Sequence, residues 1–169
     1  MIKKFKKEHS YLFFSFFIVS FICWVLELLY SLVFRDAFVL PGVMLGPYLP
    51  IYGSTFVLLE LCLRKKDNIM NNFLKTGIIA AIMEYVVSFI SDTVFNHIIW
   101  DYSDSFMNLH GRICLEMTMI FTLLGLSLYY LLDPILRKIY VRFEKGIKVF
   151  NKIMIVVFVL DIIVNTIWL

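Results

Sequence analysis

The sequence has few of the features that organise metalloproteins or disulfide-bonded domains. Only three of its 169 residues are cysteine, and Cys23, Cys62 and Cys114 all lie in or at the edge of apolar segments. Because no C-x-x-C pair or cysteine–histidine spacing indicates a metal site, we interpret them as small buried hydrophobic side chains. Charged residues are also scarce, at 17% of the chain.

Short catalytic motifs are absent as well. Without H-E-x-x-H or a comparable motif we predict no metal site, although several side chains could supply ligands: His97, Asp101, Asp104, His110 and Glu116. Ser103 and Ser105 lie near acidic residues and a histidine, but no G-x-S-x-G nucleophile elbow accompanies them. The chain lacks the G-x-x-x-x-G-K-[ST] loop, so it cannot itself be the ATPase of a pump. We therefore expect no cofactor and favour a protein that is not an enzyme.

Apolar residues, by contrast, make up 61% of the chain, and its mean hydropathy is +0.85. Soluble domains are typically about 45–50% apolar, and one of this length could not bury so much apolar surface. Several stretches approach the ~20 apolar residues that cross a bilayer as a helix. The sequence therefore predicts an integral membrane protein.

Five spans are predicted, in chain order Tyr11–Phe34, Pro50–Leu63, Phe73–Ile99, Ile113–Leu132 and Ile153–Leu169. The first is too long for a signal peptide and lacks a small-residue cleavage site. The second is only about 21 Å long at the helical rise, and the proline- and glycine-rich segment 41–53 predicts a broken or re-entrant helix there. The fourth is expected to end at Asp133-Pro134, because proline disfavours helix in the residue before it. Residues 135–152 mix basic and apolar side chains like an amphipathic helix in the membrane interface.

The predicted fold class is all-α: a polytopic membrane helix bundle forming a single transmembrane domain over residues 1–169. Lysine and arginine set its orientation, and 14 of the 16 lie in the amino-terminal stretch, in 64–75 and in 135–152. Five spans then place the amino terminus in the cytoplasm and the carboxyl terminus outside, in what the composition indicates is a bacterial plasma membrane. Anionic lipid headgroups explain the basic faces, so no nucleic-acid partner is expected.

Carboxylates inside the predicted spans are the strongest indication of a site. Each charged side chain at a helix centre costs about 2.5–3.5 kcal/mol on insertion scales, yet the spans hold Glu27, Glu84, Asp92, Glu116 and Asp161. By helical rise, we expect Glu27, Asp92 and Glu116 at similar depth in the outer half of the bilayer, below the stretch 100–112. Spacing of four puts Glu84, Ser88 and Asp92 on one helix face and predicts an ion pair between Arg112 and Glu116. A polar cavity open to the outside is favoured over residues that only join helices.

Several motifs resemble the ABC-transporter type IV (CmpB-like) family of small bacterial multi-pass membrane proteins. The matching pieces lie between about residues 15 and 130: Trp24-x-x-Glu27, Gly46-Pro47-x-x-Pro50-Ile51-Tyr52-Gly53, Glu84, Trp100-Asp101-Tyr102-Ser103 and Asn108-x-x-Gly111-Arg112-Ile113. The resemblance implies a membrane permease of a transport system. It assigns no catalytic residue.

We predict a permease-like or substrate-binding membrane subunit. Its outward polar cavity is predicted to be formed by Glu27, Tyr52, Glu84, Asp92, Asp101, Tyr102, Asn108, Arg112 and Glu116. Five spans are few for a complete permease, so besides membrane lipids we expect self-association or a partner subunit, such as a separate ATPase. Two alternatives stay open. One is a membrane-embedded enzyme acting on a lipid or lipid-linked substrate at the outer leaflet, with Asp101 or Glu116 as acid or base. The other is a structural or regulatory partner whose polar residues only hold the bundle together.

Overall fold

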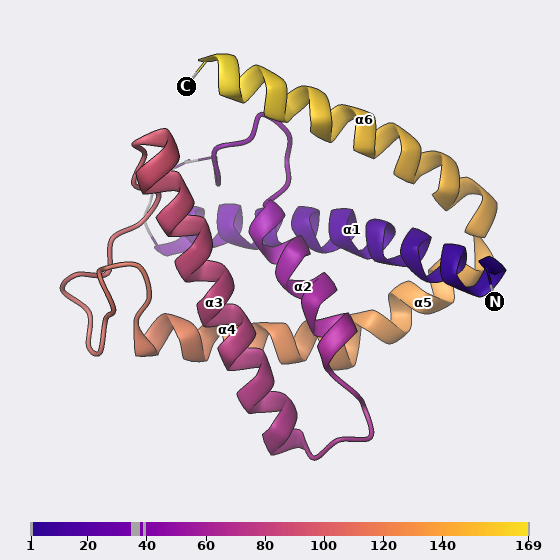
Figure 1. Cartoon of the computed structure of the whole chain (residues 1–169), viewed down its shortest axis with the longest axis horizontal. Helices are drawn as coiled ribbons and strands as arrows, with labels where there is room; N and C mark the ends of the chain where they lie inside the picture. Colours follow the sequence, from indigo (N-terminus) through magenta and orange to yellow (C-terminus); the bar gives the residue numbers. More distant parts are fainter. Residues whose placement is uncertain (1, 35–37, 39, 169) are drawn as a thin grey trace. The chain divides into compact units, whose positions relative to one another are not determined.

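The computed structural model of the chain describes residues 2–34, 38 and 40–168, and every regular element in these ranges is a helix. In chain order the elements are α1 (Ile2–Phe34), α2 (Pro50–Cys62), α3 (Ile69–Phe95), α4 (Leu115–Ser127), the π-helical η1 (Leu128–Leu132), α5 (Asp133–Arg142) and α6 (Glu144–Trp168) (Figure 1). The all-α prediction is confirmed. Leu169, the last residue of the fifth predicted span, lies outside the described residues.

Three helical stretches in the described residues are long and apolar enough to cross a membrane: Glu8–Phe34, Ile69–Phe95 and Leu115–Arg142. Helix α2 has only 13 residues, about 20 Å of helix, which is shorter than a ~30 Å hydrocarbon core. Helix α6 contains most of the fifth predicted span but is not among the three. The chain is therefore a helical membrane-type protein, and the number of five spans stays a prediction.

The chain divides into two compact units. Unit 1 combines Met1–Ser54 with Ile135–Leu169, and unit 2 is the continuous segment Thr55–Pro134. In unit 1, α1 packs against α6 largely through aromatic rings, and the centroid of Phe17 lies 6.0 Å from that of Phe158. The single transmembrane domain predicted for the whole chain stays a prediction.

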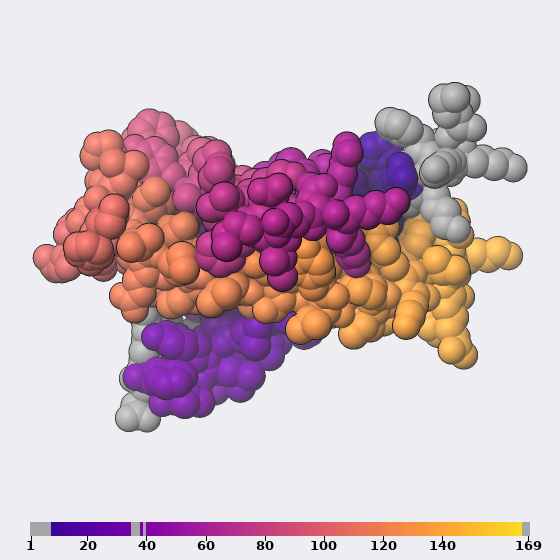
Figure 2. Space-filling model, turned by 90° about the horizontal axis from the view of Figure 1, so that it is seen from below, coloured from indigo at the N-terminus to yellow at the C-terminus, as the bar shows by residue number. Residues whose placement is uncertain are grey.

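In unit 2, α3 packs against α4 through small and polar side chains. The buried positions of α3 are three or four residues apart and nearly all polar: Asn72, Thr76, Ala80, Glu84, Ser88 and Ser91. On α4, a Cβ added to Gly125 would come within 2.9 Å of the Thr76 methyl group. The two backbones therefore approach closely, as small residues allow in membrane helix pairs. Figure 2 shows magenta residues of α3 lying directly against orange residues of α4.

Helix α3 begins and ends four residues earlier than the predicted Phe73–Ile99. At its start, the Asn68 side chain accepts a hydrogen bond from the Met70 N–H at 3.1 Å, which satisfies one of the free amides of the first turn. At its end, Asn96 adopts a left-handed conformation with φ 50°, a common way to stop a helix. These polar caps, rather than the apolar run up to Ile99, set the boundaries.

The prediction that the fourth span ends at Asp133-Pro134 is wrong. Helix continues from Leu115 through the π-helical turn to Arg142. Proline inside a helix removes a hydrogen bond and clashes with the carbonyl four residues back, and the wider π turn directly before it relieves that clash. The interfacial helix predicted at 135–152 is also divided, because α5 ends at Arg142 and α6 begins at Glu144.

Candidate functional site

The loop between α3 and α4, residues 96–114, folds on itself through hydrogen bonds between its own residues. The Tyr102 N–H donates to the Gly111 carbonyl at 2.7 Å, and the Leu109 N–H donates to the Ile113 carbonyl at 2.9 Å. Asp101 accepts the Ser103 hydroxyl at 2.6 Å and the Ser103 N–H at 2.9 Å. These donors, the hydroxyl first, lower the pKa of the exposed Asp101 carboxyl.

Asn108 and Gly111 complete this folded loop. The Asn108 amide donates to the carbonyls of Ser103 and Ser105 at 2.9 and 3.1 Å, and its oxygen accepts the Gly111 N–H at 3.2 Å. Gly111 has φ +67°, and an added Cβ would lie 2.6 Å from the Ser103 hydroxyl oxygen. Only glycine adopts this conformation without strain. The motifs W-D-Y-S and N-x-x-G-R-I are therefore two halves of one turn structure.

The same loop folds back along the carboxyl-terminal half of α3. The Arg112 guanidinium bonds Asp92 at 2.5 Å and lies 5.4 Å from the centre of the Phe89 ring. Further along the helix, the Tyr85 hydroxyl is 3.0 Å from His110 Nδ1. From Phe95 back to Tyr85 is about 15 Å of helix, so the loop lies along roughly that length of α3.

The predicted ion pair between Arg112 and Glu116 is wrong, since Arg112 pairs with Asp92. The spacing rule holds only within a helix, and α4 begins at Leu115, after an extended Cys114. Glu116 lies exposed in the first turn of α4, where a carboxylate is favoured by the free amides of a helix start.

Glu84 lies two residues from the midpoint of α3 and is 2% exposed. Neither of its carboxyl oxygens makes a hydrogen bond of regular geometry to any residue that the structure describes. Tyr102 of the loop is the polar side chain that interacts with it. A buried charge without partners costs several kcal/mol, so this carboxyl is the most unfavourably placed polar group among the predicted site residues.

Unit 1 brings two other predicted site residues together. The Tyr52 hydroxyl donates to Glu27 Oε1 at 2.5 Å, which joins the first turn of α2 to α1. Beside it, a Cβ added to Gly53 would come within 2.5 Å of the Phe16 carbonyl oxygen. Glu27 and Tyr52 thus lie where α2 starts in close contact with α1.

Asp161 of α6, which the sequence places in the fifth span, fastens the segment before α2. Residues 40–49 are irregular, as predicted, and α2 begins at Pro50. The Asp161 carboxylate accepts the N–H groups of Leu45 and Gly46 at 3.1 and 2.9 Å. The Tyr48 hydroxyl and, at 2.6 Å, the Asn165 amide also donate to it. Amides freed by the chain break are therefore bound by α6. The re-entrant geometry stays a prediction.

The sequence did not identify two further carboxylates, Glu60 and Asp133, as candidate site residues. Glu60 lies half-buried in α2, and its position inside an apolar run could have identified it. Asp133, taken as a helix terminator, is 1% exposed and accepts a hydrogen bond from Lys65 at 2.9 Å. No sequence spacing links Asp133 to Lys65, which lies 68 positions away.

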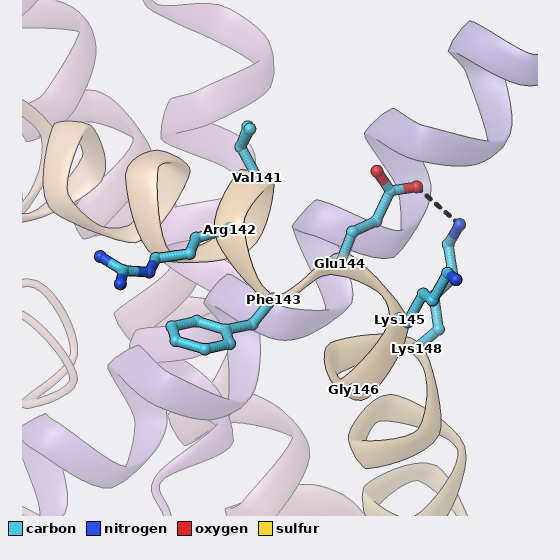
Figure 3. Close-up of a pocket in the computed structure, with 7 residues that line it drawn as sticks. All are labelled: Val141, Arg142, Phe143, Glu144, Lys145, Gly146 and Lys148. Carbon is cyan, nitrogen blue, oxygen red and sulfur yellow. Dashed lines mark hydrogen bonds and ion pairs between the residues drawn. The ribbon is translucent and has the colours of Figure 1, made fainter.

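A surface hollow of about 570 Å³ lies at the junction of α5 and α6 and is lined by Val141, Arg142, Phe143, Glu144, Lys145, Gly146 and Lys148. Glu144 and Lys148 form an ion pair at 2.7 Å, while Arg142 and Phe143 extend to the other side (Figure 3). None of the nine predicted site residues lines it. Within the described residues, no group of three or more histidine, cysteine, aspartate or glutamate side chains forms a metal site.

A family model described as "Putative ABC-transporter type IV" matches residues 14–166. The chain belongs to this family. The match extends well beyond the motifs between residues 15 and 130 and covers all nine predicted site residues, in both units. Membership in the ABC-transporter type IV family identifies the protein as a membrane protein related to ABC transporters. No curated protein and no solved structure matches the chain.

Proposed function

We propose that the protein is a permease-like membrane subunit of an ABC-type transport system and that it binds a cationic solute beside α3. The observation that carries the proposal is Glu84, a carboxyl buried inside an apolar helix and approached by Tyr102 from the α3–α4 loop. Carboxylates inside membrane helices commonly mark substrate and ion pathways. The family assignment supports a role in transport.

The charge of the predicted site favours a cation. Of its seven residues in unit 2, four are acidic and one, Arg112, is basic. That arginine is already bonded to Asp92, so it does not compensate Glu84 or the remaining acids. An excess of one sign of charge attracts ligands of the opposite sign and repels its own.

The proposed topology follows the distribution of lysine and arginine. The amino terminus lies in the cytoplasm of a bacterium, five helices cross its plasma membrane, and the α3–α4 loop lies at the outer side. Large exposed apolar side chains on this loop, Ile98, Phe106 and Met107, fit a position against lipid. Because the chain has no ATP-binding loop, a separate ATPase subunit supplies the energy, and subunits associate to complete the pathway.

Thermal unfolding of the detergent-purified protein tests solute binding. Choline, spermidine and arginine serve as cationic probes, glutamate and phosphate as anionic probes, and sucrose as a neutral one. A probe present at about 100 times its Kd stabilises the folded state by ~2.7 kcal/mol, which raises Tm by roughly 5–10 °C in a chain of this size. We expect such a rise with a cation only.

The matched variants are Glu84→Gln and Asp104→Asn. Both remove one carboxylate, but Asp104 is exposed in the loop. Glu84→Gln should abolish the rise in Tm, and Asp104→Asn should retain it. The proposal fails if no cation raises Tm, or if Glu84→Gln responds like the wild type. If variants at Glu84, Asp101 and Arg112 lower only the yield of folded protein, the polar residues are structural.

A further inference from the structure

Glu84 differs from four other carboxyl groups of the fold in how its oxygens are satisfied. Those four accept hydrogen bonds from identified donors: Glu27 from Tyr52, Asp92 from Arg112, Asp133 from Lys65, and Asp161 from Tyr48, Asn165 and two backbone amides. Glu84 is 2% exposed, and among the described residues neither oxygen has a donor in regular hydrogen-bond geometry.

A buried carboxyl in this situation does not stay ionised, because desolvation of the charge is not repaid by hydrogen bonds or a counter-ion. We propose that Glu84 is a proton-binding site: a neutral carboxyl in the middle of α3 that exchanges its proton with the loop end of that helix. The proton site is inferred from the burial and hydrogen bonding of Glu84 within unit 2. Its part in transport rests on the proposed function, in which a cationic solute competes with the proton for the same oxygens.

Polar side chains lie on the buried face of α3 between Glu84 and the loop end of the helix. Ser88 and Ser91 follow at one and two turns on the same buried face, and Tyr102 approaches from the loop. Hydroxyl groups both donate and accept hydrogen bonds, and the Ser91 hydroxyl donates to the His97 carbonyl at 2.6 Å, so the polar face of α3 reaches the loop.

The charged groups identified on the neighbouring elements do not compensate the charge of an ionised Glu84, so a proton neutralises it. On α3, Asp92 lies about 12 Å further along the helix and is paired with Arg112. On α4, Glu116 is exposed in the first turn. From the loop, His110 contacts Tyr85 rather than Glu84.

Dicyclohexylcarbodiimide provides a direct test, because this apolar reagent reacts with protonated carboxyl groups. The carboxyl oxygen bonds to the central carbon of the reagent, and the carboxyl proton moves to one nitrogen. The resulting O-acylisourea rearranges to a stable N-acylurea, and nothing is released. Peptide mapping by mass spectrometry then locates the adduct in the wild-type protein, reconstituted in lipid.

We expect the adduct on Glu84 near neutral pH. It should be at least about tenfold more abundant than on exposed Asp104, since tenfold corresponds to only ~1.4 kcal/mol of difference in proton binding. The yield should fall as the pH rises, because the ionised group does not react. Glu84→Gln should remove the adduct, whereas Glu27→Gln, which changes a carboxylate already bonded to Tyr52, should leave it.

Mapping in the wild type does not depend on whether the variants fold. A folded protein without an adduct on Glu84, or with a yield that is independent of pH, overturns the proposal. The reaction needs no solute, so the two proposals fail separately. An adduct without a cation-induced rise in Tm refutes the transport role and keeps the proton site, and the reverse pair of results refutes the proton site alone.

Discussion

Replacing Gly111 by alanine should open the α3–α4 loop, and the structure sets the size of the effect. A non-glycine residue in the left-handed conformation, here at φ +67°, costs roughly 1–2 kcal/mol. The new Cβ would also lie 2.6 Å from the Ser103 hydroxyl oxygen and 2.7 Å from Asp101 Oδ1. These atoms must separate, which weakens two hydrogen bonds worth about 0.5–1.5 kcal/mol each. With the cost of the conformation, the total is roughly 2–5 kcal/mol.

Hydrogen exchange measures this effect locally. The amides of Tyr102 and Leu109 are bonded within the loop, to the Gly111 and Ile113 carbonyls, so they exchange when the loop opens. A loss of roughly 2–5 kcal/mol accelerates their exchange about 30- to 5000-fold. The helical amides of α3 should change little.

Gly146→Ala is the matched control. A Cβ at Gly146 meets nothing within 4 Å, and alanine is favoured over glycine in a helix by up to about 1 kcal/mol. This variant should leave loop exchange unchanged. If the amides of Tyr102 and Leu109 exchange at wild-type rates in Gly111→Ala, the loop is not held by the contacts described, and the account of the N-x-x-G-R-I motif is refuted.

Other contacts give further predictions. Asp161→Asn weakens the hydrogen bonds from the Leu45 and Gly46 amides. Hydrogen bonds to a charged group are worth about 1.5–3 kcal/mol, so hydrogen exchange of these amides should accelerate at least tenfold. The control variant Asp104→Asn should leave their exchange unchanged. Lys65→Met removes the ion pair with the buried Asp133 and should lower Tm, at a cost of about 1–3 kcal/mol, whereas Lys66→Met, a change at an exposed neighbour, should not. Because the folded loop lowers the Asp101 pKa, its stabilising contribution is present above the unfolded value near pH 4 and lost as the pH falls through the lowered pKa. Exchange of the Tyr102 amide, corrected for intrinsic rate, should therefore rise on acidification in the wild type and not in Asp101→Asn.

The helices could be predicted from the sequence because lipid imposes long apolar segments and proline and glycine interrupt them. The first predicted span and α1 both end at Phe34, and α2 begins at the predicted Pro50. The predictions failed where a tertiary contact or a local cap decides the structure. Pro134 lies within a continuing helix because a π turn precedes it and the adjacent Asp133 is buried against Lys65.

The candidate site also has features that the sequence predicts and contacts that it does not. Helical spacing places Glu84 and Ser88 on one face of α3, and the structure buries both on the face that packs against α4. The partner of Arg112 could not be predicted, because two consecutive left-handed residues, His110 and Gly111, redirect the chain before α4 starts. The contact of Asp161 with Leu45 and Gly46 joins residues more than 110 positions apart, which no spacing rule reaches.

The hydrogen bonds separate two interpretations of the intramembrane polar residues. If these residues only held helices together, each polar atom should find a partner, because an unsatisfied buried group costs more than its hydrogen bond gains. Glu27, Asp92 and Asp161 meet that expectation. Glu84 does not, since Tyr102 interacts with it but neither of its buried oxygens has a donor in regular hydrogen-bond geometry among the described residues. A structural role therefore accounts for the first three and leaves Glu84 without an explanation unless a proton or a cation binds it.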